Sequence, residues 1–372
     1  MSNTQVLNND AAGRNVTKAQ ETRIVTEMIR GDLYDGLMGK GSMSAFRVVN
    51  DLTKQRGDTI RLYFGGKLLD DGVDGDDTLE GNEEAIRDFY QEIRIGQKRK
   101  AVRLAGKLTE QRSQVPLRVR SGELLSGFTK DIMNEYKTWS LYGARGVRAG
   151  NGLITPITFT GFAGNTLLAP DNTHWYIADT ATSSTPAATA LTATATMKTS
   201  VLEAVRKKIA LLSITGQGFE PMTYDGTTVR GVVYLTPEQM SDLRQDSGWK
   251  DDFRLGYDPG KSNPIFKGNS FLYADFLIKE NPLGVLFNNY GASGTLAAAR
   301  AVVVAPNALG IAWGYNFGDG AGGVWGNWAY KEKEFDYANQ AGFATCAQFG
   351  VQKLRWNGMD NGVFTFDTAY SA

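Results

Sequence analysis

The chain has 372 residues, and its 40 basic and 40 acidic side chains give a formal net charge of +0. This balance argues against a dedicated reader of nucleic acid, for which a strongly basic domain is usual. The single cysteine, Cys346, excludes an intrachain disulfide, and the single histidine, His174, leaves no Cys/His metal cage or Cys–His nucleophile pair. Ordinary globular composition indicates a soluble α+β protein of about two domains. The sequence contains no apolar run long enough for a membrane span and no signal peptide, so we expect no membrane contact and a place in the cytoplasm that makes the protein.

Residues 1–56 are predicted to form an N-terminal arm. After a polar tail, residues 21–54 carry apolar side chains at scattered helical spacing, and glycines interrupt the pattern. The apolar residues are Ile24, Met28, Leu33 and Leu37. We expect an arm that contains short helical pieces.

Residues 57–97 are predicted to form a long β-hairpin, because apolar side chains alternate in residues 58–64 and again in residues 89–95. The tip between the two strands, residues 67–81, is rich in glycine and aspartate. Its few apolar residues are Leu68, Leu69, Val73 and Leu79. Such a tip should stand away from the body or lie on a neighbouring molecule.

The sign of the charge reverses just after this hairpin. Between Gly65 and Gly96 ten acids face three bases, and from Gln97 to Arg120 eight bases face one acid. Adjacent blocks of opposite charge suit the mating of copies of one protein, so we expect both blocks to lie at a subunit interface. The acidic interface residues are Asp70, Asp71, Asp74, Asp76, Asp77, Glu80, Glu83 and Glu84. The basic interface residues are Lys98, Arg99, Lys100, Arg103, Lys107, Arg112, Arg118 and Arg120.

A long helix over residues 117–142 dominates the next region, residues 98–228. Pro116 suits the first helical position, apolar residues then recur at steps of three and four, and Gly143 suits the end. Gly122 and Gly127 either mark a bend, let a neighbouring element approach closely, or are simply tolerated.

The same region contains a stretch of small residues, 181–196, that we expect to form an extended surface loop. Ser200 and Glu203 have the spacing of a capping box, which predicts an amphipathic helix that closes the region.

Residues 229–372 are predicted to form a second body with a central β-sheet flanked by helices. Residues 229–235 read as a strand, and Thr236 and Pro237 then start a helix that ends near Gln245. Residues 301–305 and 308–311 repeat this order of strand then helix. We expect further strands at 335–356 and 363–366, with Cys346 as a small core residue.

Several of these segments together resemble the N-four-type major capsid protein family of tailed bacteriophages. In the first third of the chain they are Gly57-Asp58-Thr59, Lys67-Leu68, Asp71-Gly72-Val73, Asp77-Thr78-Leu79-Glu80-Gly81-Asn82-Glu83-Glu84 and Lys107-Leu108-Thr109-Glu110-Gln111-Arg112. Further along they are Arg230-Gly231-Val232-Val233-Tyr234-Leu235-Thr236-Pro237-Glu238-Gln239, Ala308-Leu309-Gly310-Ile311-Ala312-Trp313-Gly314, Glu334-Phe335-Asp336-Tyr337, Gly342-Phe343-Ala344 and Phe349-Gly350. The resemblance extends over roughly residues 20–370.

The resemblance implies the tailed-phage capsid fold of the Hong Kong ninety-seven type. The arm would be residues 1–56, the extended loop 57–97, the peripheral domain with its spine helix 98–228, and the axial domain 229–372. It also implies a virion protein, assembled in the host cytoplasm, that forms pentamers and hexamers and closes into an icosahedral shell around double-stranded DNA. Because only about twenty residues precede the first apolar pattern, we expect a separate scaffolding protein. A portal protein is a further implied partner, and a decoration protein is left open.

Two motifs point elsewhere but lack their context. Gly318, Gly320 and Gly323 satisfy G-x-G-x-x-G without the strand and helix that a dinucleotide site requires, so we interpret them as an axial loop near a symmetry axis. Residues 70–81 approach a calcium loop, but Gly81 stands where a bidentate Glu is needed. We therefore predict no cofactor, and weak cation binding stays an alternative.

Other function classes remain open from the residues alone. A glycosidase needs only two acids at a separation that sequence does not reveal, and it would show a concave cleft with aromatic walls. A decoration protein would be a stable monomer, and a non-viral shell subunit would share the fold. We expect a structural protein without enzymatic activity and, lacking an acceptor for a donor such as Lys67, without covalent crosslinks.

Overall fold

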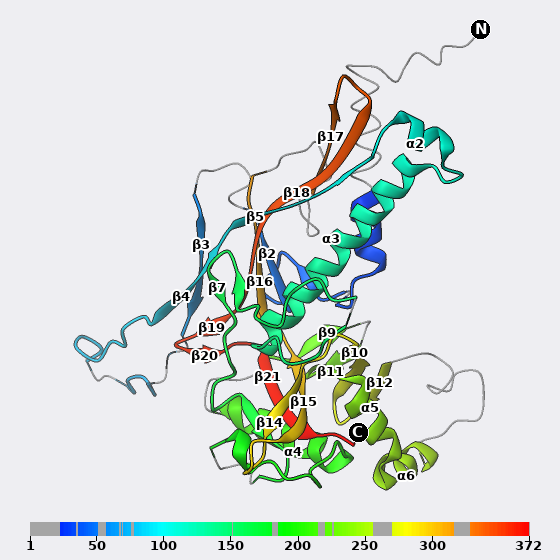
Figure 1. Cartoon of the computed structure of the whole chain (residues 1–372). Coiled ribbons are helices and arrows are strands. Elements are labelled where there is room, and N and C mark those ends of the chain that lie inside the picture. The colour runs from blue at the N-terminus through cyan, green and yellow to red at the C-terminus, as the bar shows by residue number, and fades with distance from the viewer. Residues whose placement is uncertain are drawn as a thin grey trace.

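The structure is a computed structural model in which a long helix lies along one mixed sheet and a second mixed sheet lies at its far end (Figure 1). It describes residues 23–34, 36–50, 57–66, 68, 70–75, 78–150, 152–180, 185–214, 220–224, 227–255, 270–315 and 328–371. Sheets and helices follow one another in mixed order along the chain, which confirms the predicted α+β class.

The first sheet has six strands in the order β1-β2-β16-β18-β17, with β5 also paired to β18. The strands are β1 (Met38–Gly39), β2 (Phe46–Val49), β5 (Gly96–Arg103), β16 (Leu309–Trp313), β17 (Ala329–Phe335) and β18 (Gln340–Lys353). Helix α3 (Leu117–Tyr142) lies on this sheet, where Tyr136 stacks on Phe162, and both rings contact Phe349 of β18. The helix has the predicted bounds. Pro116 is its N-cap rather than its first residue, and Gly143 ends it in the left-handed conformation.

The arm contacts both α3 and the first sheet. A helix over residues 23–30 buries Ile24 and Met28 in the core shared with α3. Past that helix, the amide of Asn134 in α3 donates to the carbonyl of Gly31 at 2.7 Å. The predicted short helical piece is therefore present, whereas β1 and β2 in the arm were not predicted.

The second sheet has seven strands in the order β12-β13-β11-β15-β21-β8, with β14 also paired to β15. The strands are β8 (Trp175–Ile177), β11 (Gly231–Leu235), β12 (Ser270–Tyr273), β13 (Phe276–Glu280), β14 (Leu286–Tyr290), β15 (Leu296–Val304) and β21 (Val363–Ala369). The helices near this sheet are α4 (Thr199–Ile214), α5 (Pro237–Gln245) and α6 (Ser247–Leu255). Residues of α4, α5 and the sheet share one hydrophobic core, as expected for a sheet covered by helices.

The predicted starts of the two helices that pack on the second sheet, α4 and α5, differ in outcome. At α5 the Thr236 hydroxyl accepts from the Gln239 N–H and the Gln239 side chain accepts from the Thr236 N–H, which forms a capping box. The predicted start at Thr236 and Pro237 and the predicted end at Gln245 are confirmed. The capping box predicted at Ser200 is wrong, because α4 begins at Thr199. The N–H and hydroxyl of Thr199 both donate to the Asp246 carboxylate at the end of α5. The helix also packs on the second sheet instead of closing the region of α3.

The helix predicted at residues 308–311 is wrong, because residues 309–311 lie in strand β16. All five residues of β16 are buried, and the strand pairs with β18 on one side and β2 on the other. A fully buried central strand has no polar alternation, so its sequence does not distinguish it from a short buried helix.

The loop rich in small residues is anchored at several points. Residues 188–190 form a 3-10 helix, and Leu191 and Ala195 are buried in the core of the second sheet. Most of residues 185–196 are exposed, which confirms a surface loop, but the 3-10 turn and the buried residues mean that it is not simply extended. Residues 181–184 lie outside the described part.

The remaining elements are short. They are β3 (Thr59–Gly65), β4 (Asp88–Arg94), α2 (Lys107–Arg112), β6 (Gly161–Phe162), β7 (Asn165–Thr166), β9 (Met222–Tyr224), β10 (Thr227–Val229), β19 (Arg355–Trp356) and β20 (Met359–Asp360). Because β8 joins the second sheet while β16 to β18 join the first, both sheets draw strands from both sides of residue 228. The domain boundaries at residues 56, 97 and 228 stay predictions.

Candidate subunit interface

The hairpin is fixed to the first sheet at its base. Strands β3 and β4 pair in the predicted antiparallel arrangement, with Ile60 opposite Ile93. These two side chains and Leu62 form a small core with Ala312 and Leu354. The inner face is therefore the apolar one that the alternation predicted.

Two glycines allow this close contact between hairpin and sheet. A Cβ at Gly350 of β18 would lie 2.1 Å from the carbonyl oxygen of Arg94, and one at Gly310 of β16 would lie 2.4 Å from Ile93. A backbone neighbour at such a distance cannot be accommodated without moving the strand. Glycine at position 350 therefore lets the backbone of β4 lie directly on the sheet, and glycine at position 310 leaves room for the Ile93 side chain.

The outer face of the hairpin carries a tyrosine pair and an ion pair. Tyr63 and Tyr90 are opposite one another, more than half exposed, with ring centroids 6.1 Å apart. Beside them Arg61 donates to Glu92 at 2.8 Å, and this hydrogen bond and charge raise the pKa of Arg61. Exposed aromatic rings held on a paired strand are typical of residues that contact a partner.

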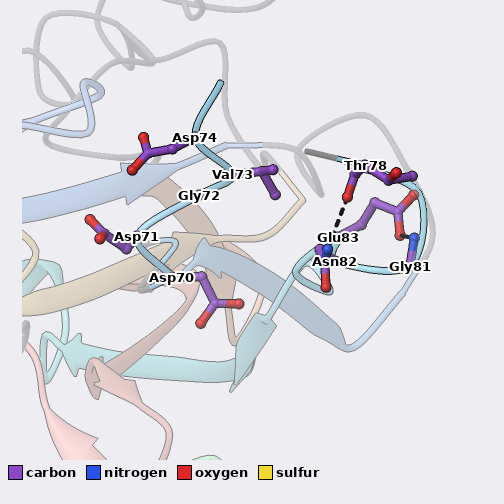
Figure 2. Close-up of a pocket in the computed structure, with 9 residues that line it drawn as sticks. All are labelled: Asp70, Asp71, Gly72, Val73, Asp74, Thr78, Gly81, Asn82 and Glu83. Carbon is purple, nitrogen blue, oxygen red and sulfur yellow. Dashed lines mark hydrogen bonds between the residues drawn. The ribbon is translucent and has the colours of Figure 1, made fainter. Parts of the chain in front are cut away.

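The tip of the hairpin forms a shallow acidic hollow of about 900 Å³ (Figure 2). Two of its acids hold the loop together: Glu84 accepts from the N–H of Asp70 at 3.1 Å, and Glu83 accepts from the N–H of Gly81 at 2.8 Å. Among the described residues no base forms an ion pair with Asp70, Asp71, Asp74 or Glu80. Asp76 and Asp77 lie outside the described part.

Apolar side chains protrude from this acidic tip. Leu68 is 70% exposed, Leu79 is 62% exposed and Ile86 is 82% exposed. Covering an exposed apolar side chain on a projecting loop with a partner removes apolar surface from water and so stabilises the complex. The sequence flagged Leu68 and Leu79 as the residues the tip has to bury, and within one chain they stay uncovered.

The predicted basic stretch divides into two groups. In the first, Lys98 lies over the rings of Tyr136 and Phe162, Lys100 lies over Phe128, and Arg103 lies over Phe335. Such contacts with aromatic faces hold the cation against its own subunit. Arg118 belongs with this group, because it pairs with Glu110 and Glu332.

The second group consists of Arg99, Lys107, Arg112 and Arg120. All four are exposed, and none forms an ion pair with a described acid. Arg99 comes from β5, Lys107 and Arg112 come from α2, and Arg120 comes from the first turn of α3. We call these four residues the open basic group.

The acidic tip and the open basic group of one chain do not meet. No ion pair links them among the described residues, and in Figure 1 the hairpin projects on one side while α2 lies at the other end of α3. Each charged surface is therefore available to a different molecule.

The structure adds no support, within the described residues, for the other sites considered in the sequence analysis. Within the described residues no group of three metal-ligating side chains converges, and no helix is long and apolar enough to cross a membrane. Gly318, Gly320 and Gly323 lie outside the described part. Residues that the sequence analysis missed include Tyr63, Tyr90 and the fully exposed Tyr337 of the β17–β18 turn. The only sequence signal for the first two was their place opposite the apolar face of the strands.

Comparison with known proteins places these features in a family. A family model described as phage capsid protein matches residues 5–372. The major capsid protein of Pseudomonas phage KPP25 is 28% identical over 333 residues, which cover 85% of this chain and 83% of that protein. Among solved structures, the capsid of Ralstonia phage GP4 is 26% identical with a TM-score of 0.77, covering 92% of both chains. The capsid of cyanophage Pam1 shares the fold at 17% identity and a TM-score of 0.73, covering 92% of this chain and 93% of that one. The match over nearly the whole sequence means that this chain belongs to the phage capsid protein family and is a major capsid protein.

Proposed function

We propose that this major capsid protein forms the pentamers and hexamers of an icosahedral shell that encloses the double-stranded DNA of a tailed phage. The observation that carries the proposal is the pair of unmatched charged surfaces at opposite ends of one chain. A subunit with complementary ends binds a second copy head to tail, and such contacts close into rings when the rotation between copies permits it.

The contact we propose places the acidic tip of one subunit over the open basic group of its neighbour. Exposed ion pairs contribute only about 0.2–1 kcal/mol each, so four of them give a few kcal/mol at most. A ring repeats the contact at every subunit, and weak single contacts let misplaced subunits leave before the shell closes. Leu68, Leu79 and Ile86 would add apolar contact to the same interface.

We extend the proposal to the place of assembly, the partners and the absence of catalysis. We expect assembly in the host cytoplasm with a separate scaffolding protein and a portal protein, and a structural role without enzymatic activity or cofactor. The even balance of charge suits a wall around DNA, because a strongly basic wall would bind the phosphates and hinder movement of the genome.

Charge reversal tests the proposed contact. Replacing Asp70, Asp71 and Asp74 with Lys should slow shell formation and lower its yield, because the tip would then repel the open basic group. Adding Arg99→Glu, Lys107→Glu and Arg112→Glu in the same chain should restore part of the yield. Assembly is followed by light scattering at low salt and at about 1 M salt, where the Debye length is about 3 Å and the variants should differ less.

A matched control separates this contact from a general effect of net charge. Asp131→Lys, Glu203→Lys and Glu334→Lys change the net charge by the same amount at acids outside the tip, and they should leave assembly close to wild type. If the control slows assembly as much as the tip variant, or if the combined variant shows no rescue, the proposed contact is wrong.

A further inference from the structure

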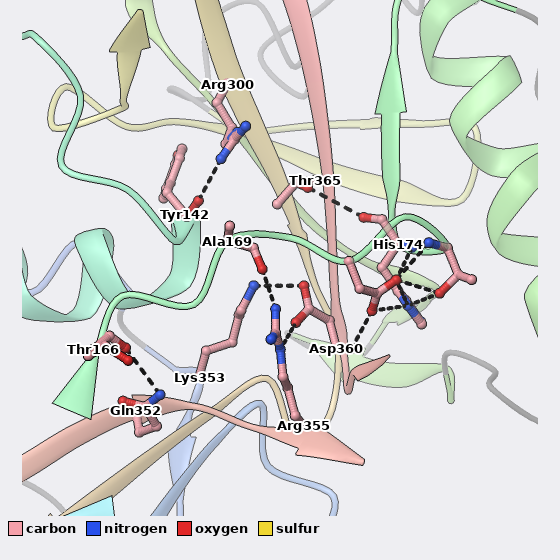
Figure 3. Close-up of polar contacts among 12 residues, drawn as sticks. Tyr142, Thr166, Ala169, His174, Arg300, Gln352, Lys353, Arg355, Asp360 and Thr365 are labelled. Atoms are coloured by element: carbon pink, nitrogen blue, oxygen red, sulfur yellow. Dashed lines mark hydrogen bonds and ion pairs between the residues drawn. The ribbon is translucent and has the colours of Figure 1, made fainter. Parts of the chain in front are cut away.

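A buried cluster of charged side chains lies where the chain crosses from the first sheet to the second (Figure 3). Lys353, at the end of β18, donates to Asp360 of β20 at 2.7 Å, and both side chains are fully buried. Arg355 donates to the other carboxylate oxygen of Asp360 at 2.8 Å. Asp360 is thus held from two sides just after β18 leaves the first sheet.

The same cluster continues to the second sheet. The N–H of Asp360 donates to the Asp171 carboxylate, which also accepts from the N–H of His174 at 2.9 Å. The carbonyl of His174 accepts in turn from the N–H of Thr365 in β21 at 2.9 Å. An unbroken series of hydrogen bonds therefore joins the end of β18 to β21.

A second buried cluster ties the end of α3 to the second sheet. Arg300 of β15 donates twice to the Asp367 carboxylate of β21, at 2.8 Å each, and once to the hydroxyl of Tyr290 at 2.9 Å. Its remaining nitrogen donates at 3.1 Å to the carbonyl of Tyr142, the last residue of α3. Trp175 of β8 donates to the same carboxylate at 2.8 Å.

The buried charges in these two clusters are not explained by their contribution to stability. Desolvation offsets most of the attraction within a buried ion pair, and apolar residues of similar volume are often at least as stabilising. Hydrogen bonds differ from apolar contacts in that they act over a narrow range of distances and angles. Hydrogen bonds that link the first sheet and α3 to the second sheet therefore fix the orientation of one sheet relative to the other.

We call these two clusters the inter-sheet joint. We propose that the joint sets the angle between the first sheet, with α3 on it, and the second sheet, and that this angle sets the curvature of the shell. The joint consists of Asp171, Arg300, Lys353, Asp360 and Asp367. A fixed angle repeated in every subunit gives shells of one size, whereas a loosened joint lets neighbouring subunits adopt different angles. The inference rests on the shell assembly proposed above.

The test replaces the Lys353–Asp360 pair with apolar residues of similar size, Lys353→Met with Asp360→Leu, in shells purified from infected cells. Arg355 is left partly exposed and reaches water, so no buried charge is stranded. We expect a melting temperature close to wild type, and a fall by at least half in the fraction of particles with the wild-type diameter measured by cryo-electron microscopy. Shells that keep the uniform wild-type diameter would overturn the proposal.

A second buried Lys–Asp pair provides the control. Lys137 and Asp32 are equally buried but link the arm to α3 instead of linking the two sheets. Lys137→Met with Asp32→Leu should leave the diameter uniform, and equal broadening in this control would also overturn the proposal. If the joint variant does not fold, Lys353→Met with Asp360→Asn keeps the shape of the Asp360 side chain while removing both charges of the pair, and it should broaden the diameters to a smaller extent. Failure of the proposed ring assembly would appear in wild-type particles, whereas failure of the joint appears only as wild-type diameters in these variants.

Discussion

At the scale of single residues, the buried charges depend on a few strong acceptors, and Asp171 is the clearest case. Burial disfavours its charged form, but hydrogen bonds from the His174 ring, the Thr173 hydroxyl and the N–H of Asp360, together with charge on His174, outweigh that effect. The result is a pKa well below the usual range of an aspartate. A carboxylate held in this way stabilises the folded state only while it is ionised.

This residue gives a prediction about acid stability. The folded-state pKa lies below the unfolded value of about 3.9, so the stabilisation is complete above that value and decreases as the pH falls below it. Asp171→Asn should lower stability at pH 7 by about 1.5–3 kcal/mol, as for the loss of a hydrogen bond to a charged group. Thermal unfolding of both proteins from pH 7 to pH 3 should show the gap narrowing. A gap that stays constant down to pH 3 would mean that the charge of Asp171 contributes nothing.

At the scale of secondary-structure elements, the sequence predicts the helices and strands whose residue patterns depend only on neighbouring residues. The alternation in β3 and β4, the apolar steps of α3 with Gly143 at its end, and the capping box of α5 are each set by neighbouring residues. Strand β16 was missed because its partners come from distant parts of the chain, and all its side chains are buried. For the same reason, the sequence did not show that Lys98, Lys100 and Arg103 lie on aromatic rings of their own subunit while Arg99 stays exposed.

Glycine substitutions test how the hairpin is fixed to the sheet. Gly350→Ala would bring a methyl group to 2.1 Å from the Arg94 carbonyl, so we expect a loss of at least about 1–3 kcal/mol in unfolding free energy. The methyl group of Gly127→Ala in α3 would meet no atom within 4 Å from the part of the chain that the structure describes, apart from the helix itself, and alanine is favoured over glycine in a helix by about 1 kcal/mol. That variant should unfold at a higher temperature. Chemical denaturation of both variants measures the difference, and equal stability would show that the close contact at Gly350 is not maintained.

Gly127 also bears on assembly, because the sequence left open whether it permits close approach by another element. Among the described residues of the same chain, none has an atom within 4 Å of that position beyond the helix itself. If a neighbouring subunit does, Gly127→Ala should stabilise the free subunit yet reduce the yield of shells. Sedimentation of assembled particles separates this outcome from simple tolerance, in which the yield stays unchanged.

At the scale of the whole molecule, a chain with no net charge presents an acidic tip at one side and an open basic group at another. Because no ion pair joins these surfaces among the described residues, we propose that a second copy of the chain supplies the complement of each. Membership of the phage capsid protein family is consistent with exposed charged surfaces on a single chain, because a capsid protein functions as one of many subunits in a shell.

A cryo-electron microscopy map of intact particles, at a resolution that shows side chains, tests this account most directly. We predict that carboxylates of Asp70, Asp71 and Asp74 lie within about 4 Å of side-chain nitrogens of Arg99, Lys107, Arg112 or Arg120 in the adjacent subunit, the distance of an ion pair. Leu68 and Leu79 should be covered by the same neighbour. A tip that projects into solvent, or that rests on a surface without these bases, would contradict the account.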